Sequence, residues 1–171
     1  MIMAGMIAVF GMLLIAAAVS DLRQLRIPNR LNASIAGLWA LYILIGRISG
    51  QDVPEIGPTL AIAGLVALTG SILFFLRAIG GGDVKMLAAV ALWAGPSGIF
   101  NLLVVTALVG GLVSAVIWGQ SRLQTVAQSA TKTDPTVEFD APKAGRLQVP
   151  YGVAIAAGGL VVASQLIFNA F

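Results

Sequence analysis

Long apolar runs alternate with short polar breaks along the whole chain. Six segments show this pattern, and Gly, Pro or charged residues separate them: about Ile2–Val19, Leu31–Ile48, Pro58–Leu76, Val84–Ala94, Ile99–Gly119 and Val153–Phe168. A helix needs about 20 apolar residues to cross a bilayer, and most of these segments approach that length. The pattern therefore predicts an all-α, polytopic membrane bundle of about six transmembrane helices.

The fourth segment is the exception to this pattern. Val84–Ala94 would rise only about 16 Å as a helix, against a hydrocarbon core of about 30 Å, and Gly95-Pro96-Ser97-Gly98 ends it. The segment must recruit flanking residues, cross a thinned bilayer or be re-entrant.

The composition supports the membrane prediction and limits the chemistry. Of the 171 residues 58% are hydrophobic and 10% are charged, whereas a soluble domain carries about 25% charged residues. The sequence contains no Cys and no His, which excludes zinc sites built on those ligands and catalysis by Ser-His-Asp or Cys-His. We expect a single domain over residues 1–171, with a flexible polar loop at about 120–148.

The basic residues predict how the chain is oriented. With the N-terminus outside, all but one of the ten lie on the same side, leaving only Arg47 on the other. Because cytoplasmic loops carry the excess of Lys and Arg, that side is expected to be cytoplasmic. The basic residues are scattered among membrane segments, so they do not indicate nucleic-acid binding.

Two aspartates at the cytoplasmic ends of their segments are the candidate catalytic residues. Asp21 closes the first apolar run, and Asp83 follows the triplet Gly80-Gly81-Gly82. Carboxylates near the hydrocarbon boundary are expensive and usually mark function. Two of them on one side of the membrane suffice for general acid–base chemistry on a peptide.

Each aspartate also has a purely structural interpretation. Asp83 could be the N-cap of the fourth helix, and Asp21 could pair with Arg23, Arg26 or Lys85. The glycines either allow a backbone that other residues forbid, by positive φ or close substrate approach, or only permit tight helix packing. A Ser–Lys peptidase using Lys85 with Ser20 or Ser71 is a weaker alternative.

The motifs around both aspartates resemble those of the type IV prepilin peptidases. Gly80, Gly82 and Asp83 form the Gly-x-Gly-Asp motif of membrane aspartic peptidases. Asp21-Leu22-Arg23 with Ile27-Pro28-Asn29 looks like the family's first-aspartate motif, and Val149–Ala154 is also similar to it. The chain is most similar to the short subfamily that serves Flp (tight-adherence) pili.

This resemblance implies an aspartic endopeptidase in the bacterial inner membrane, with Asp21 and Asp83 as its catalytic dyad. The implied substrate is a prepilin or pseudopilin, cut between a short basic leader and a hydrophobic helix at the cytoplasmic boundary. No cofactor or metal is implied. Lys85 is expected either to orient an aspartate or a substrate carboxylate, or simply to reach the membrane boundary.

Two other classes of protein remain as alternatives. A small ion-coupled transporter subunit also uses broken helices and membrane carboxylates, and an assembly subunit of a pilus or secretion system needs no catalysis. Carboxylates at mid-span would favour transport, whereas these two lie at one face. Cleavage in detergent separates the classes, because a peptidase needs no gradient.

Overall fold

The computed structural model describes residues 2–130 and 150–169, and all of its regular structure is helical. The five helices are α1 (Ile2–Gln24), α2 (Asn29–Ile48), α3 (Ile56–Phe75), α4 (Gly81–Ala130) and α5 (Tyr151–Asn169). Each contains a stretch long and apolar enough to cross a membrane. The predicted all-α membrane bundle is therefore confirmed.

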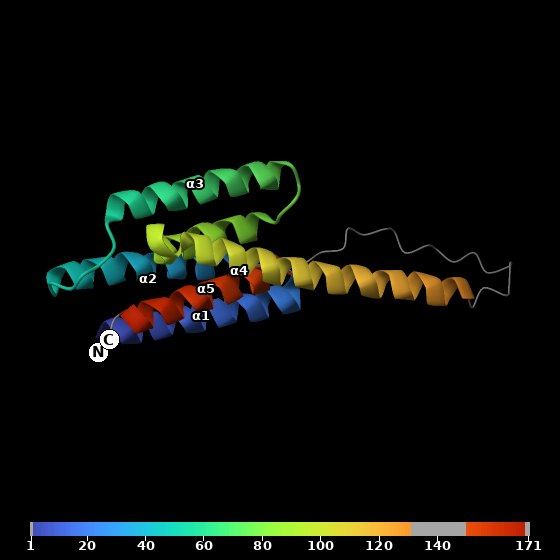
Figure 1. The fold of residues 1–171 in the computed structure, drawn as a ribbon, viewed down its shortest axis with the longest axis horizontal. Coiled ribbons are helices and arrows are strands. Elements are labelled where there is room, and N and C mark those ends of the chain that lie inside the picture. The colour runs from blue at the N-terminus through green and yellow to red at the C-terminus, as the bar shows by residue number, and fades with distance from the viewer. Residues whose placement is uncertain (1, 131–149, 170–171) are drawn as a thin grey trace.

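The fourth and fifth predicted segments belong to one element, α4. Gly95 interrupts this helix with φ 56° and ψ −169°, and Pro96 follows it. A positive φ is readily adopted only by Gly, and Pro cannot continue the hydrogen bonding of a preceding turn. Figure 1 shows the chain turning back here, so that the first arm of α4 (81–94) runs against the second arm (96–130).

The first arm begins three residues earlier than the sequence pattern predicts, at Gly81. It thus recruits flanking residues, one of the three solutions open to a short segment, and rises about 21 Å. At the other end of α4, the second arm continues to Ala130. The first part of the polar stretch 120–148 is therefore helical, and its remainder from 131 lies outside the described residues.

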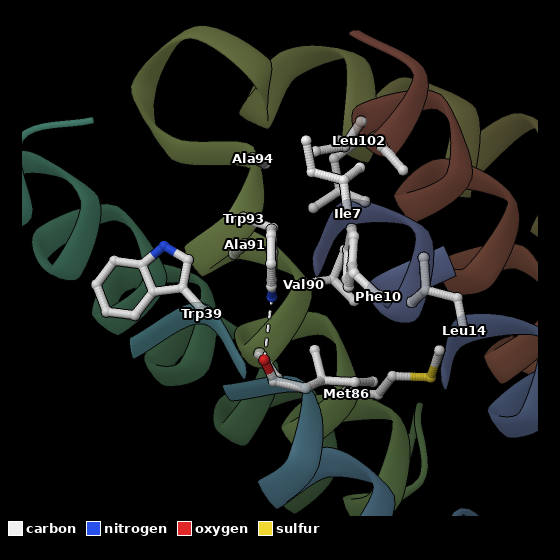
Figure 2. Close-up of a cluster of buried hydrophobic side chains, with 14 of the residues drawn as sticks. Ile7, Phe10, Leu14, Trp39, Met86, Val90, Ala91, Trp93, Ala94 and Leu102 are labelled. Carbon is white, nitrogen blue, oxygen red and sulfur yellow. Dashed lines mark hydrogen bonds between the residues drawn. The ribbon is translucent and has the colours of Figure 1, made fainter. Parts of the chain in front are cut away.

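Aromatic stacking joins the helices at the centre of the bundle (Figure 2). Trp93 of the first arm lies parallel to Phe10 of α1, with ring centroids 4.3 Å apart. Its indole N–H donates to the Ile35 carbonyl oxygen of α2 at 3.0 Å, and the Tyr42 ring packs against it. Trp93 therefore serves packing and fixes α1 and α2 around the first arm.

The helices alternate in direction, so that their ends gather at two opposite ends of the bundle (Figure 1). One end carries the α1–α2 connection, the α3–α4 connection and the start of α5. The other carries the turn at Gly95 and the ends of α2 and α5. Asp21 and Asp83 both belong to the first of these ends, which we call the aspartate end.

Candidate active site

Asp21 lies on the core-facing side of α1. The buried residues of this helix include Phe10, Leu14, Ala17 and Asp21, which recur at the three- and four-residue spacing of one helical face. Only 4% of the Asp21 surface is exposed. The apolar stripe of α1 thus ends in a carboxylate instead of another apolar side chain.

The start of α5 binds this buried carboxylate. The Gly152 N–H donates to Asp21 Oδ2 at 2.8 Å, and the Val153 N–H also interacts with the carboxylate. First-turn N–H groups have no partner within their own helix, and the N-terminal end of a helix favours an anion. This interaction offsets the unfavourable position of Asp21 in the last turn of α1.

The ion-pair interpretation of Asp21 is not what the structure shows. The side chains of Arg23, Arg26 and Lys85 are all exposed, and none of the three forms a salt bridge with Asp21. The Lys85 ammonium group donates instead to Asn29 Oδ1 at 3.0 Å. In the described part of the chain, the partners of the Asp21 carboxylate are backbone N–H groups.

Asp83 is held by the start of its own helix. The Gly80 carbonyl oxygen accepts the Val84 N–H at 3.2 Å, so Gly80 occupies the N-cap position and Asp83 is the third residue of α4. The Asp83 carboxylate in turn accepts the Gly80 N–H. This is the return half of a capping box, so Asp83 caps the first turn without being the N-cap that its sequence position suggests.

The two carboxylates line a single pocket at the aspartate end. The pocket has a volume of about 240 Å³, and its walls are Asp21, Leu25, Arg26, Ile27, Gly80, Gly81, Gly82 and Asp83. The two aspartates interact electrostatically across it. All three glycines of the predicted motif therefore belong to its wall, together with both predicted catalytic residues.

The connection after α1 shapes the pocket between the two aspartates. Leu25 adopts a left-handed conformation with φ 51°, which ends α1 and turns the chain toward Ile27. Ile27 is buried and packs between Gly152 on one side and the backbone at Gly82 on the other. A strained residue beside a pocket is a feature often found at functional sites.

The glycines act differently from the sequence-based expectation. None of Gly80, Gly81 and Gly82 has a positive φ, so the expected need for that backbone conformation is wrong. At Gly80 a Cβ would lie 2.7 Å from Asp83 Oδ2, so the carboxylate would have to shift to admit a side chain there. At Gly82 a Cβ would make only ordinary contacts, at 3.5 Å or more, with Ile27.

The two serines considered from sequence, Ser20 and Ser71, lie outside the pocket. Ser20 donates to the Arg26 carbonyl oxygen and Ser71 to that of Ala67, so neither hydroxyl is bound to Lys85. Asp52 lies at the opposite end of the bundle, beside a separate cavity. Among the described residues, no three His, Cys, Asp or Glu side chains gather as a metal site would require.

Sequence reasoning gave no role to two residues that complete the site, although one of them, Gly152, lies within the stretch Val149–Ala154 noted above. Gly152 supplies the N–H that binds Asp21, and Asn32 donates from Nδ2 to the Gly82 carbonyl oxygen at 3.2 Å. Pro150 directly before Tyr151 could have identified the start of a helix, and hence free N–H groups. No comparable signal distinguishes Asn32 from other polar residues at the start of a helix.

Comparison with known proteins places the chain in a family. Residues 8–115 match the model of the type IV leader peptidase family. The chain is also 31% identical over 125 residues to a prepilin leader peptidase/N-methyltransferase from Pectobacterium carotovorum subsp. carotovorum, a match that covers 67% of this chain. It spans only 42% of that relative's length. No solved structure matches. Since the matched residues carry both aspartates and make up more than half of the sequence, the chain belongs to the type IV leader peptidase family.

Proposed function

We propose that this protein is an aspartic endopeptidase of the membrane, and that Asp21 and Asp83 are its catalytic dyad. The observation that carries the proposal is the shared pocket, into which α1 and α4 each bring one carboxylate. Two carboxylates in one pocket are able to divide the roles of base and acid. With a volume of about 240 Å³, the pocket admits a water molecule, which occupies about 30 Å³, beside a peptide group.

The chemistry requires one shared proton. The ionised aspartate removes a proton from water as the water oxygen attacks the scissile carbonyl carbon. The protonated aspartate donates a hydrogen bond to the carbonyl oxygen, and a proton then passes to the leaving nitrogen as the C–N bond breaks. The proton belongs to the pair, so either aspartate is able to serve as base.

The proposed substrate is a prepilin or pseudopilin whose leader is removed at the cytoplasmic face. The relative named as a prepilin leader peptidase motivates this choice. The distribution of basic residues supports a cytoplasmic position for the aspartate end. This end carries Arg23, Arg26, Arg30, Arg77 and Lys85, whereas Arg47 lies at the other end. Such a bias is typical of the cytoplasmic side of a bacterial inner-membrane protein. The Flp-pilus subfamily and a single domain over residues 1–171 remain part of the proposal.

In this proposal Lys85 binds the substrate and does not act on the aspartates. Its exposed ammonium group is bound to Asn29, and it does not line the pocket that holds the aspartates. A cation at the edge of the site is positioned to receive an acidic group of the precursor. Orientation of either aspartate is instead the task of Gly152, Val153 and Gly80.

The decisive experiment replaces each carboxylate by its isosteric amide. Asp21→Asn and Asp83→Asn should each reduce cleavage of a prepilin by at least about 10²–10⁴-fold, because neither amide is able to exchange the required proton. The assay uses purified protein in detergent, with N-terminal sequencing of the product. Asp52→Asn at the opposite end is the matched control and should retain full activity.

This assay also separates the proposal from its rivals. Cleavage in detergent needs no gradient, so a transporter subunit would show no such activity. Substantial cleavage by either amide variant, at normal expression and stability, would remove that aspartate from the dyad.

A further inference from the structure

An apolar groove runs along the membrane-embedded part of the bundle between α2 and α3. Its floor is the first arm of α4, and its volume is about 570 Å³. The residues along it are mostly small, among them Ala33, Ala36, Ala63, Gly64, Ala67 and Ala88. We call this feature the α2–α3 groove.

The groove exists because the backbones of its two walls stay apart. Both α2 and α3 pack against α4, but the described backbones of α2 and α3 do not approach each other closely. Figure 1 shows the first arm of α4 lying between α2 and α3. Small side chains on three neighbouring helices allow a further helix to approach closely, which is how helices associate within a membrane.

One residue that lines the groove has a polar atom without a partner among the described residues. Asn32 is 5% exposed and lines the groove near its polar end, beside Asn29 and Lys85. Its Nδ2 donates to the Gly82 carbonyl oxygen, which fixes the direction of the amide. Its Oδ1 is buried and accepts no hydrogen bond from the described residues. A buried acceptor without a donor is unfavourable, so Asn32 gains a hydrogen bond when its amide shifts toward an occupant that brings an N–H or O–H group.

We propose that the α2–α3 groove receives the apolar membrane helix of the substrate, with an N–H of that helix donating to Asn32 Oδ1. This inference rests on the proposed function and names the surface that holds the substrate. The first turn of a helix carries N–H groups without internal partners, whereas a lipid acyl chain carries no donor. The occupant is therefore a helix that begins beside Asn32.

The position of Asn32 connects the groove with the catalytic pocket. The residue that it binds, Gly82, is also in the wall that Asp21 and Asp83 share. A helix whose first turn meets Asn32 would thus lie with its preceding peptide bonds near the two aspartates. Lys85 and Asn29 stand at this same end, where an acidic side chain early in the helix would find a cation.

Filling the groove tests the inference without disturbing the fold. No atom lies within 4 Å of a Cβ built at Gly64, and the same is true of exposed Gly111 in the second arm of α4. Gly64→Trp should lower kcat/KM for a membrane-anchored precursor by about tenfold, the effect of losing about 1.4 kcal/mol of binding free energy. Gly111→Trp is the matched control and should have no effect.

A second substrate shows whether the loss arises in the groove. A short peptide that contains the leader and the cleavage junction, but no apolar helix, should be cleaved equally by Gly64→Trp and by the unmodified protein. An equal loss with both substrates, or no loss with either, would overturn the inference.

Cross-linking keeps the inference separate from the proposed chemistry. A photoreactive residue in place of Gly64, in an Asp21→Asn, Asp83→Asn background, should cross-link to the membrane helix of the bound precursor. This result would support the groove even if the unmodified protein cleaved nothing, which would refute only the proposed function. Cross-links to lipid alone, or to a second copy of the chain, would identify a different occupant and overturn the inference.

Discussion

The two aspartates share a pocket but are held by different kinds of structure. Asp21 is 4% exposed and binds the N–H of Gly152, a residue 131 positions away on another helix. Asp83 is half-buried and binds the N–H of Gly80, three residues before it in its own first turn. One carboxylate therefore depends on the packing of the bundle, and the other on local helix geometry.

The helix that binds Asp21, α5, is tightly packed against its neighbours. A Cβ at Gly159 would lie 2.7 Å from a Leu14 methyl carbon, and one at Gly158 would lie 2.8 Å from the Leu102 carbonyl oxygen. The backbone of α5 is thus already in close contact with α1 and with the second arm of α4. Since protein interiors are close-packed, a small displacement of α5 cannot be absorbed by its neighbours.

Because the two carboxylates are held differently, the same kind of change should have two kinds of effect. A change that moves α5 should lower stability and activity together, because it alters packing as well as the Asp21 carboxylate. A change at the start of α4 should alter the carboxylate alone. Adding one methyl group beside each aspartate compares the two directly.

The largest expected effect of such a methyl group is at Gly152. A Cβ there would lie 2.7 Å from Asp21 Oδ2 and 2.8 Å from Ile27 Cδ1, and both neighbours are buried. Gly152→Ala should destabilise the protein by about 1–3 kcal/mol through overpacking. It should also reduce prepilin cleavage by at least about tenfold, the effect of about 1.4 kcal/mol on the barrier. Thermal unfolding in detergent and cleavage rates measure the two losses.

Gly37→Ala is the control for this change. A Cβ at Gly37 would meet no atom within 4 Å, so the same substitution there should leave both quantities unchanged. Normal activity and stability of Gly152→Ala would mean that the tight packing of α5 on Asp21 is not needed.

A smaller effect, confined to activity, is expected at Gly80. A Cβ there would lie 2.7 Å from Asp83 Oδ2, and the half-buried carboxylate is free to move away from it. Gly80→Ala should therefore reduce cleavage by about tenfold, as expected for a loss of about 1.4 kcal/mol in the transition state. The stability change should be below about 1 kcal/mol, as for other substitutions of glycine by alanine at an N-cap. Parallel losses in activity and stability would show that Asp83 also depends on packing.

Gly82→Ala serves as the comparison for Gly80→Ala within the same motif. From the sequence, Gly82 could serve function, through positive φ or close substrate approach, or could serve only helix packing. In the structure the φ of Gly82 is not positive, and the added methyl group would pack against Ile27 at 3.5 Å. Gly82→Ala is therefore expected to retain the cleavage rate that Gly80→Ala loses.

Much of this arrangement could be predicted from the sequence, because it follows from segment length and charge. The apolar runs give the helices, and their alternating direction brings Asp21 and Asp83 to one end. The three glycines before Asp83 likewise mark the pocket wall. Each of these features depends on residues near one another in the chain, which is why reasoning along the sequence finds them.

The remaining features depend on contacts between distant segments. Pro150 marks the helix start that frees the Gly152 N–H, but no local pattern shows that this N–H binds Asp21, and none indicates the bond from Asn32 to Gly82. The conformation at Gly95 is another case, since Gly-Pro predicts a break without stating whether the chain reverses. Only packing decides which N–H meets a carboxylate and where a broken helix turns.

The smallest expected effect belongs to Lys85, whose charge could serve either an aspartate or the substrate. The ammonium group is exposed and binds Asn29 at 3.0 Å, while backbone N–H groups hold both aspartates. Lys85→Met keeps the apolar stem and removes the charge. It should raise KM for a membrane-anchored precursor by about fivefold, which corresponds to the loss of one hydrogen bond of about 1 kcal/mol. It should leave kcat unchanged, because the affinity for the ground state and for the transition state falls by the same amount. Arg77→Met, at the same end of the bundle but outside the pocket and the α2–α3 groove, controls for the loss of positive charge. A fall in kcat for Lys85→Met would instead assign Lys85 to the orientation of the aspartates. The carboxylates would then be held by the charge of Lys85 as well as by helix packing at Asp21 and local helix geometry at Asp83.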